Sequence, residues 1–211
     1  MSQNYTVKQG DHIFSIAKQF DFRDYHIIWD HPNNAALKQK RTTPHVLFPG
    51  DTVFIPDKNI KTEPIATTQV HRFQIDLEPL KLRIALKDFD NQPIPNMPCE
   101  LEVEGTVYKL TSDGKGLIEK EIPATAQTGS LKVPNLDLEM PLKIGHLDPH
   151  DEDPGWQARL VNLGYHPGPV GDTDTEQLGY SIEEFQCDHG LPVTGKLDGA
   201  TKAKLKEAHG A

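Results

Sequence analysis

The spacing of hydrophobic residues changes twice along the chain, and this limits what its 211 residues can fold into. Near both ends, apolar residues recur every three or four positions, which is typical of one face of an α-helix. From about residue 70 to residue 144 they alternate with polar residues, which is typical of half-buried β-strands. We therefore expect several small modules in sequence. A hydrophobic fraction of 36% agrees with this, because small domains bury a smaller share of their surface.

Residues 1–60 are predicted to form a first module with the order strand, helix, helix, strand. Tyr5 and Val7 alternate with polar residues as in a strand, and Asp11 stands where an N-cap residue would precede a helix. The first helix is predicted from four apolar positions at helical spacing, namely Ile13, Ile16, Ala17 and Phe20.

The second half of this module is predicted from its turn residues. Pro32 interrupts a further apolar group, so the second helix is expected to begin after it. Residues 49–51, Pro-Gly-Asp, form a strong turn signal, and Val53 and Ile55 then alternate as the second strand.

Residues 61–145 are predicted to form a β-sandwich, after a polar linker over residues 57–69. Short apolar runs of period two are separated by turn clusters at residues 88–98, 112–116 and 124–129. The positions that define these runs are Phe73, Ile75, Leu77, Leu80, Leu82, Ile84, Leu86, Leu101, Val103, Val107, Tyr108 and Leu110.

Residues 146–211 are predicted to form three short helices around a small core, after a linker rich in acid and proline. Gly164 stands where a helix C-cap would end the first helix. The positions with helical spacing are Trp156, Leu160, Leu163, Ile182, Phe185, Ala203 and Leu205. The fold class expected for the whole chain is multidomain α+β.

The net charge of −9 is uneven along the chain. The segments 1–60, 61–145 and 146–211 hold 7, 10 and 5 basic residues against 6, 13 and 12 acidic ones, which gives +1, −3 and −7. An acidic chain without a basic stripe argues against nucleic acid or an anionic membrane as the partner.

The N-terminal residues resemble no secretory signal, and no run of about 18 apolar residues suggests a membrane span. Cys99 and Cys187 fall in different predicted modules and are expected to be reduced thiols. We therefore expect a cytoplasmic protein, or one exported to the periplasm or a target cell by a non-Sec route.

The first segment resembles a LysM domain. The matching residues are Tyr5-x-Val7-x-x-Gly10-Asp11-x-Ile13-x-x-Ile16-Ala17-x-x-Phe20 and Leu47-x-Pro49-Gly50-Asp51-x-Val53-x-Ile55-Pro56. The resemblance implies a βααβ fold that binds the N-acetylglucosamine-containing strands of peptidoglycan in a groove between two loops. The ligand-binding residues that it implies are Gly10, Asp11, His12, Ile13, Leu47, Phe48, Pro49 and Gly50.

Two aromatic side chains of this segment have alternative interpretations. His12, beside the implied groove, suits either a hydrogen bond to a ligand or an exposed surface position. Trp29 suits either stacking on a sugar ring or, as we favour, packing between helices.

The last segment resembles the small helical peptidoglycan-binding domain that is often appended to wall hydrolases. The matching residues are Leu160-x-x-Leu163-Gly164-Tyr165 and Phe185-Gln186-x-x-x-Gly190-Leu191-x-Val193-x-Gly195-x-Leu197-Asp198-x-x-Thr201. One departure lies between the first two helices, where residues 170–175 replace the family's usual Asp-Gly turn. It bears on ligand binding more than on the fold.

The middle segment resembles a carboxypeptidase-regulatory-like sandwich, through the turn residues that follow Asp88 and Asp113. The whole order is similar to accessory proteins of type VI secretion and related contractile injection systems. That similarity implies a secretion spike or effector protein as a further partner.

Two groups of residues suggest catalysis, and neither completes a site. Cys187 and His189 lie at the end of a predicted helix that belongs to the binding signature, and the acidic tract of residues 146–153 lacks a rigid scaffold for a metal. We therefore predict no catalytic residues, metal or cofactor. The predicted function is non-catalytic peptidoglycan binding, and the alternative is a structural adaptor that binds secretion proteins without binding the wall.

Overall fold

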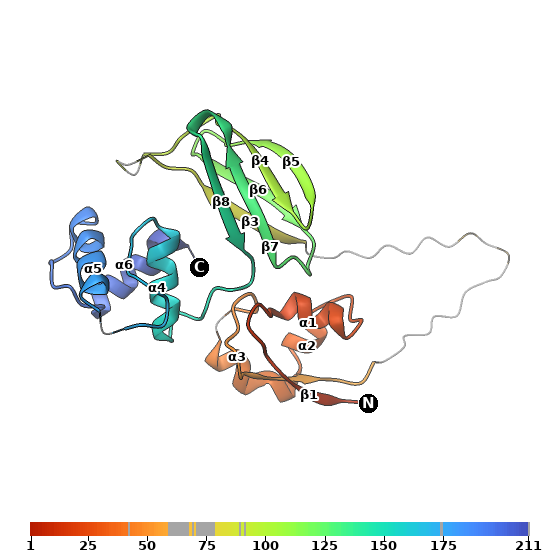
Figure 1. Cartoon of the computed structure of the whole chain (residues 1–211). Coiled ribbons are helices and arrows are strands. Elements are labelled where there is room, and N and C mark those ends of the chain that lie inside the picture. The colour runs from red at the N-terminus through yellow and green to blue at the C-terminus, as the bar shows by residue number, and fades with distance from the viewer. Residues whose placement is uncertain are drawn as a thin grey trace. The chain divides into compact units, whose positions relative to one another are not determined.

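The computed structural model describes residues 1–41, 43–58, 68, 70, 79–88, 90, 92–173 and 175–210 (Figure 1). The chain divides into two compact units: residues 1–45 with 49–146, and residues 46–48 with 147–211. No helix in the described residues is long and apolar enough to cross a membrane. The predicted strand with Phe73, Ile75 and Leu77, and most of the predicted linker before it, lie outside the described residues.

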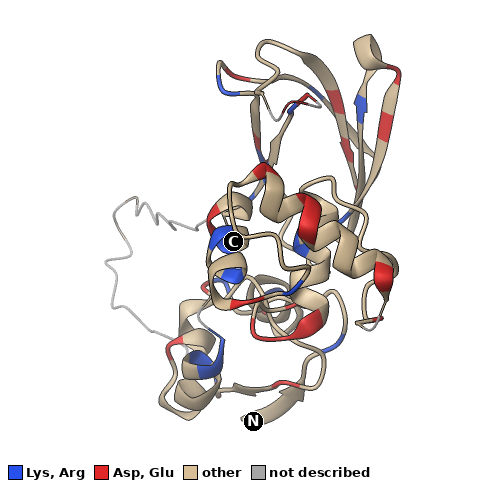
Figure 2. Cartoon of the chain, turned by 90° about the vertical axis from the view of Figure 1, so that its left-hand side faces the viewer, with Lys and Arg blue, Asp and Glu red and all other residues tan. Residues whose placement is uncertain are grey.

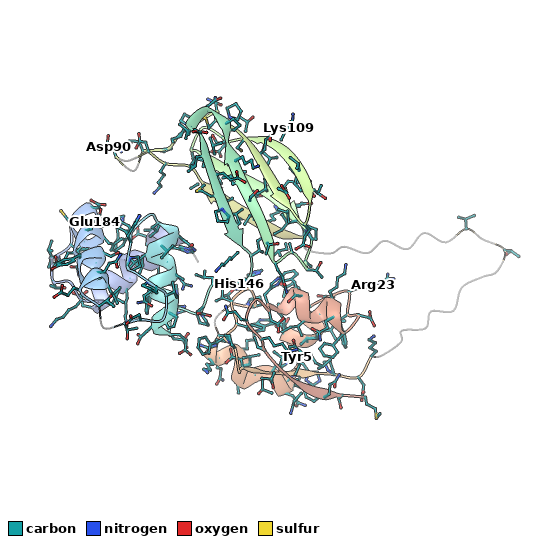
Figure 3. All side chains as sticks on the ribbon, viewed as in Figure 1. Tyr5, Arg23, Asp90, Lys109, His146 and Glu184 are labelled. Carbon is teal, nitrogen blue, oxygen red and sulfur yellow. The ribbon has the colours of Figure 1, made fainter. Side chains whose placement is uncertain are left out.

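The N-terminal part of the first unit has the expected order of strand, helices and strand. Its elements are β1 (Gln3–Thr6), α1 (Ile13–Gln19), α2 (His26–Trp29), the 3₁₀ helix η1 (Pro32–Asn34), α3 (Ala35–Lys40) and β2 (Thr52–Ile55). β1 pairs with β2 in antiparallel register, with Tyr5 opposite Val53 (Figure 3 labels Tyr5). The ladder is prolonged by hydrogen bonds from Val7 N–H to the Asp51 carbonyl and from Gly50 N–H to the Val7 carbonyl, both 2.9 Å.

Helix α1 begins one residue later than predicted, because His12 rather than Asp11 is its N-cap residue. The Asp11 carboxylate instead closes the preceding turn, accepting hydrogen bonds from the Tyr5 hydroxyl (2.7 Å) and the Lys8 N–H (2.8 Å). Burial, followed by this contact with Asp11, raises the pKa of Tyr5 to about 12.

The second predicted helix is split into α2, η1 and α3, so the apolar residues before Pro32 form a helical turn of their own. Ile28 and Trp29 are buried there, as favoured for Trp29. The buried Asn34 side chain joins this turn to β2. Its amide donates to the carbonyls of Ile28 and Phe54 and accepts from the Phe54 N–H, at 2.7–2.8 Å.

A buried ion pair ties the end of α3 to the start of β2. Arg41 donates from Nε and Nη2 to the two carboxylate oxygens of Asp51, at 2.7 and 3.1 Å. The two side chains are 0% and 4% exposed, so this ion pair is buried, and Lys40 lies 3.4 Å from the same carboxylate.

The remaining strands of the first unit form two antiparallel sheets. The strands are β3 (Leu80–Ala85), β4 (Pro98–Val103), β5 (Thr106–Thr111), β6 (Leu117–Ile122), β7 (Thr128–Val133) and β8 (Leu138–Lys143), with the 3₁₀ helix η2 (Pro134–Leu136) before the last. One sheet pairs β3 with β6, and the other has the order β5-β4-β7-β8. Both sheets contribute to one core, in which Leu101 faces Leu131 across β4 and β7 and Ile118 comes from β6.

Polar side chains at the turns close these hairpins. The carboxylate oxygen Oδ1 of Asp113 accepts from the N–H groups of Lys115 and Leu117 (both 2.8 Å), which lowers the pKa of Asp113. Asp88 makes the same pattern with the second and fourth residues after it. Gly116 has φ +73°, and a Cβ there would lie 2.5 Å from the Leu86 carbonyl oxygen, so the turn requires glycine.

The second unit contains the three predicted helices, α4 (Asp153–Asn162), α5 (Glu176–Asp188) and α6 (Gly199–His209). Their buried residues form one small core, composed of Trp156, Leu160, Tyr165, Leu178, Ile182, Phe185 and Leu205. Gly164 follows α4 with φ +96°, as its expected capping position requires. Within α4, a Cβ at Gly155 would lie 1.9 Å from the Pro149 carbonyl oxygen, so only glycine allows this approach.

We predict that Asp51→Ala lowers the free energy of unfolding of the N-terminal part by about 3–5 kcal/mol, because it removes the carboxylate that accepts two hydrogen bonds from the buried Arg41 guanidinium. The chain has two tryptophans. In a Trp156→Phe background, Trp29 fluorescence during urea unfolding therefore follows this part of the full-length chain.

Asp30→Ala is the matched control, because Asp30 pairs with Lys38 and both side chains are about half exposed. Its expected cost is about 0–1 kcal/mol. If the two variants lower the free energy of unfolding equally, the buried pair contributes no more to stability than the exposed pair does.

Candidate functional site

The structure distributes the eight predicted ligand-binding residues over both units. Gly10, Asp11, His12, Ile13, Pro49 and Gly50 belong to the first unit, whereas Leu47 and Phe48 belong to the second. Gly10 and Gly50 have φ values of +89° and +95°, so the glycine in each of the two predicted loops adopts the left-handed conformation that favours glycine.

Burial separates these eight residues into two groups. Gly10, His12, Ile13 and Leu47 are buried, Asp11, Phe48 and Pro49 are half-buried, and Gly50 is exposed. Ile13 has no exposed surface, so its side chain packs in the core. His12 is likewise not an exposed surface histidine. The assignment of this set to sugar binding stays a prediction.

A hollow lies beside α5, in the second unit. It is an open cavity of about 470 Å³, which is within the usual range for ligand pockets. Its lining residues come from α4, α5 and the loops before α5 and α6, namely Asp153, Gln157, Thr173, Thr175, Leu178, Gly179, Ile182, Gly195, Lys196 and Leu197.

One wall of the cavity is the loop before α5, and the buried side chain of Gln157 fixes it. The Gln157 amide accepts from the Gly171 N–H (2.6 Å) and donates to the Asp172 carbonyl (2.5 Å). Thr175 then starts α5 as its N-cap residue, with its hydroxyl accepting from the Leu178 N–H at 3.1 Å. Thr173 and Thr175, which belong to the segment that departs from the family pattern, therefore line the cavity.

Another wall is the loop before α6, and a second buried amide, Gln186, fixes it. Its oxygen accepts from the N–H groups of Thr194 and Gly195, at 2.7 and 3.1 Å. Its nitrogen lies within 3.1 Å of the Thr194 hydroxyl, the Lys196 carbonyl and the Thr201 hydroxyl. A side chain with no exposed surface thus holds the loop that presents Lys196 to the cavity.

Asp198 completes this wall as the N-cap residue of α6. Its carboxylate accepts from the Thr201 N–H (2.8 Å) and the Thr201 hydroxyl (2.9 Å), and these bonds lower the pKa of Asp198. Asp198 and Thr201, the Asp-x-x-Thr pair of the sequence signature, therefore cap helix α6 and have a structural role.

The floor of the cavity is the face of α5 around Gly179. Leu178 and Ile182 are 6% and 3% exposed, so they give the floor an apolar surface backed by the core. A Cβ at Gly179 would have no heavy atom within 4 Å. This helical glycine therefore leaves space open in the cavity.

Charge in the cavity comes from Asp153 on one helix and Lys196 on one loop. Within the described part of the chain, neither side chain pairs with an opposite charge. Lys and Arg positions are scattered over the ribbon in Figure 2, and acidic residues recur along α5, where Figure 3 labels Glu184. No group of three His, Cys, Asp or Glu residues that could hold a metal ion occurs among the described residues.

Comparison with known proteins shows that most of this cavity lies in a segment that matches a family model. Residues 156–205 match a family model described as "Putative peptidoglycan binding domain". The match supports a peptidoglycan-binding helical domain. Nine of the ten lining residues fall inside it, and Asp153 lies three residues before it. No curated protein and no solved structure matches the chain.

The predicted site residues include none of the residues that line this cavity. Two signals in the sequence point to it, the unusual residues 170–175 and a glycine at position 179 inside a helix. Neither signal reveals that the loops before α5 and α6 line one cavity.

Burial also predicts a pH dependence for the N-terminal part, through His12. Burial and the like charge of His45 lower the pKa of His12 from 6.5 to about 4, although Asp11 acts in the opposite direction. The unfolded chain therefore binds a proton that the folded chain does not, and stability falls by about 2–3 kcal/mol as the pH decreases from 6.5 to 4.

His12→Asn is expected to flatten this pH dependence in the Trp29 assay described above, because asparagine does not titrate and is a good N-cap residue. The exposed His26→Asn variant controls for loss of a surface histidine and is expected to keep the wild-type slope. A slope that His12→Asn leaves unchanged would contradict the assignment.

Proposed function

We propose that the protein is a non-catalytic peptidoglycan-binding protein and that the cavity beside α5 is its main contact with the wall. The observation that carries the proposal is an ordered cavity, with polar walls and an apolar floor, inside the segment that matches a peptidoglycan-binding family. Both walls are fixed by buried amides, so little conformational entropy would be lost when a ligand binds.

The N-terminal part is proposed to add a second, weaker contact to N-acetylglucosamine-containing strands. Its support is the resemblance of its turns and strands to LysM domains, with Gly10 and Gly50 in the left-handed conformation in the two predicted loops. Two weak sites on one chain gain affinity by tethering, by about 10²–10⁴ when the linker spans both.

The absence of catalysis is part of the proposal. The cavity lining includes neither histidine nor cysteine, so it lacks the usual pair of nucleophile and base. Cys99 is buried in β4, and burial raises the pKa of its thiol, which makes it a poor nucleophile.

Incubation with purified peptidoglycan followed by mass spectrometry tests this point, and we expect no released muropeptides. Cys187→Ala serves as the comparison, because Cys187 is an exposed free thiol. Release by the repurified protein that this variant abolishes would contradict the proposal.

A structural adaptor is the second candidate. The observation in its favour is that Val170, Tyr180 and Val193 of the C-terminal unit are 48–64% exposed, as residues that contact a protein partner can be. The finer context that we propose for either function is an accessory of a contractile secretion system, with a spike or effector protein as partner.

Gly179→Leu separates these two candidates. The change fills the cavity from its floor without a backbone clash, because Gly179 lies in a helix and its Cβ direction is open. We expect retention on purified sacculi to fall at least about tenfold, which corresponds to about 1.4 kcal/mol, while the fold is kept or strengthened.

Gly199→Leu is the matched control, because Gly199 is also helical and open but does not line the cavity. Circular dichroism checks that both variants fold. A wild-type chain that sacculi do not retain favours the adaptor, and equal retention of all three proteins excludes the cavity as the contact.

A further inference from the structure

The charges of the cavity describe the ligand more closely than the family match does. Asp153 is the first residue of α4, and Lys196 lies in the loop held by Gln186. Both side chains line the cavity, and within the described residues neither is neutralised by an ion pair. Between the polar walls lies the apolar floor of Leu178 and Ile182.

Peptidoglycan has two chemically different parts, and this lining suits one of them. The sugars of its glycan strands are largely uncharged and present faces of C–H groups that suit a flat aromatic ring. None of the ten lining residues is aromatic. The short peptides on the strands present free carboxylates, a free amine where the diamino acid is not cross-linked, and aliphatic side chains.

We infer that the cavity beside α5 binds the peptide part of peptidoglycan, with a ligand carboxylate at Lys196 and a ligand amine at Asp153. This inference rests on the proposed function and narrows it. The apolar floor takes aliphatic side chains, and Thr173 and Thr175 add polar lining to the same cavity. The excess of 12 acidic over 5 basic residues in residues 146–211 also favours a ligand that brings an amine.

The probe is a soluble stem tetrapeptide that contains diaminopimelate, titrated calorimetrically into the full-length protein. We expect saturable binding that Gly179→Leu abolishes and Gly199→Leu keeps. Lys196→Gln is expected to weaken binding about tenfold, as is Asp153→Asn. Lys206→Gln, which removes an exposed lysine of α6 outside the cavity, is expected to change it less than twofold.

Modified peptides identify the partner of each charge. A series of peptides is amidated at one carboxylate each. One of them should bind wild type about tenfold more weakly than the unmodified peptide does, and Lys196→Gln should not weaken its binding further. A peptide acetylated at its free amine should bind wild type about tenfold more weakly, and Asp153→Asn should not weaken its binding further. Non-additivity of this kind reports a direct pair, whereas a purely structural role of either residue would give additive losses.

Sacculi separate failure of this inference from failure of the proposed function. Amidase treatment removes the peptides from the strands. We expect it to abolish the cavity-dependent part of the retention, which is the part that Gly179→Leu also removes. Cavity-dependent retention that survives amidase treatment, with no tetrapeptide binding, overturns the inference and leaves the proposed function standing. Absence of retention on untreated sacculi overturns the proposed function itself.

Discussion

Buried amide side chains supply the hydrogen bonds on which the two helical parts of this protein depend. Short helices and short strands leave many loop N–H and carbonyl groups without a partner, and a buried backbone group left unpaired costs about 1–3 kcal/mol. Asn34 pairs with the backbone of α2 and β2, Gln157 with the loop before α5, and Gln186 with the loop before α6. Each amide is well suited, because it donates and accepts from one position.

The same constraint separates residues that define the C-terminal fold from residues that are available to a ligand. Phe185, Gln186 and Thr201 belong to the sequence signature and are buried in core packing or loop hydrogen bonds. The cavity is lined mostly by other residues, such as Thr173, Gly179 and Lys196, that these interactions hold in place. A sequence can therefore keep the signature, and with it the fold, while the ligand-facing residues change.

Much of the fold could be predicted from the sequence because it depends on local patterns. Helical spacing predicted the three C-terminal helices, and turn residues such as Gly164 marked where they end. One error arose where neighbouring residues, Asp11 and His12, were both candidates for the N-cap position. Asp11 has the chemistry of an N-cap residue, but the Tyr5 hydroxyl and the Lys8 N–H take up its carboxylate, and the helix begins after His12.

The sequence by itself determined the type and order of the elements, because hydrophobic periodicity and turn chemistry act over a few residues. It also determined the acidic character of the C-terminal segment and the residues of its family signature. Only the tertiary structure decided which residues face a cavity. Thr173 and Lys196 are 23 positions apart, and they line one hollow because the buried side chains of Gln157 and Gln186 hold their loops by hydrogen bonds. That proximity arises from side-chain packing between distant segments, which no local spacing encodes.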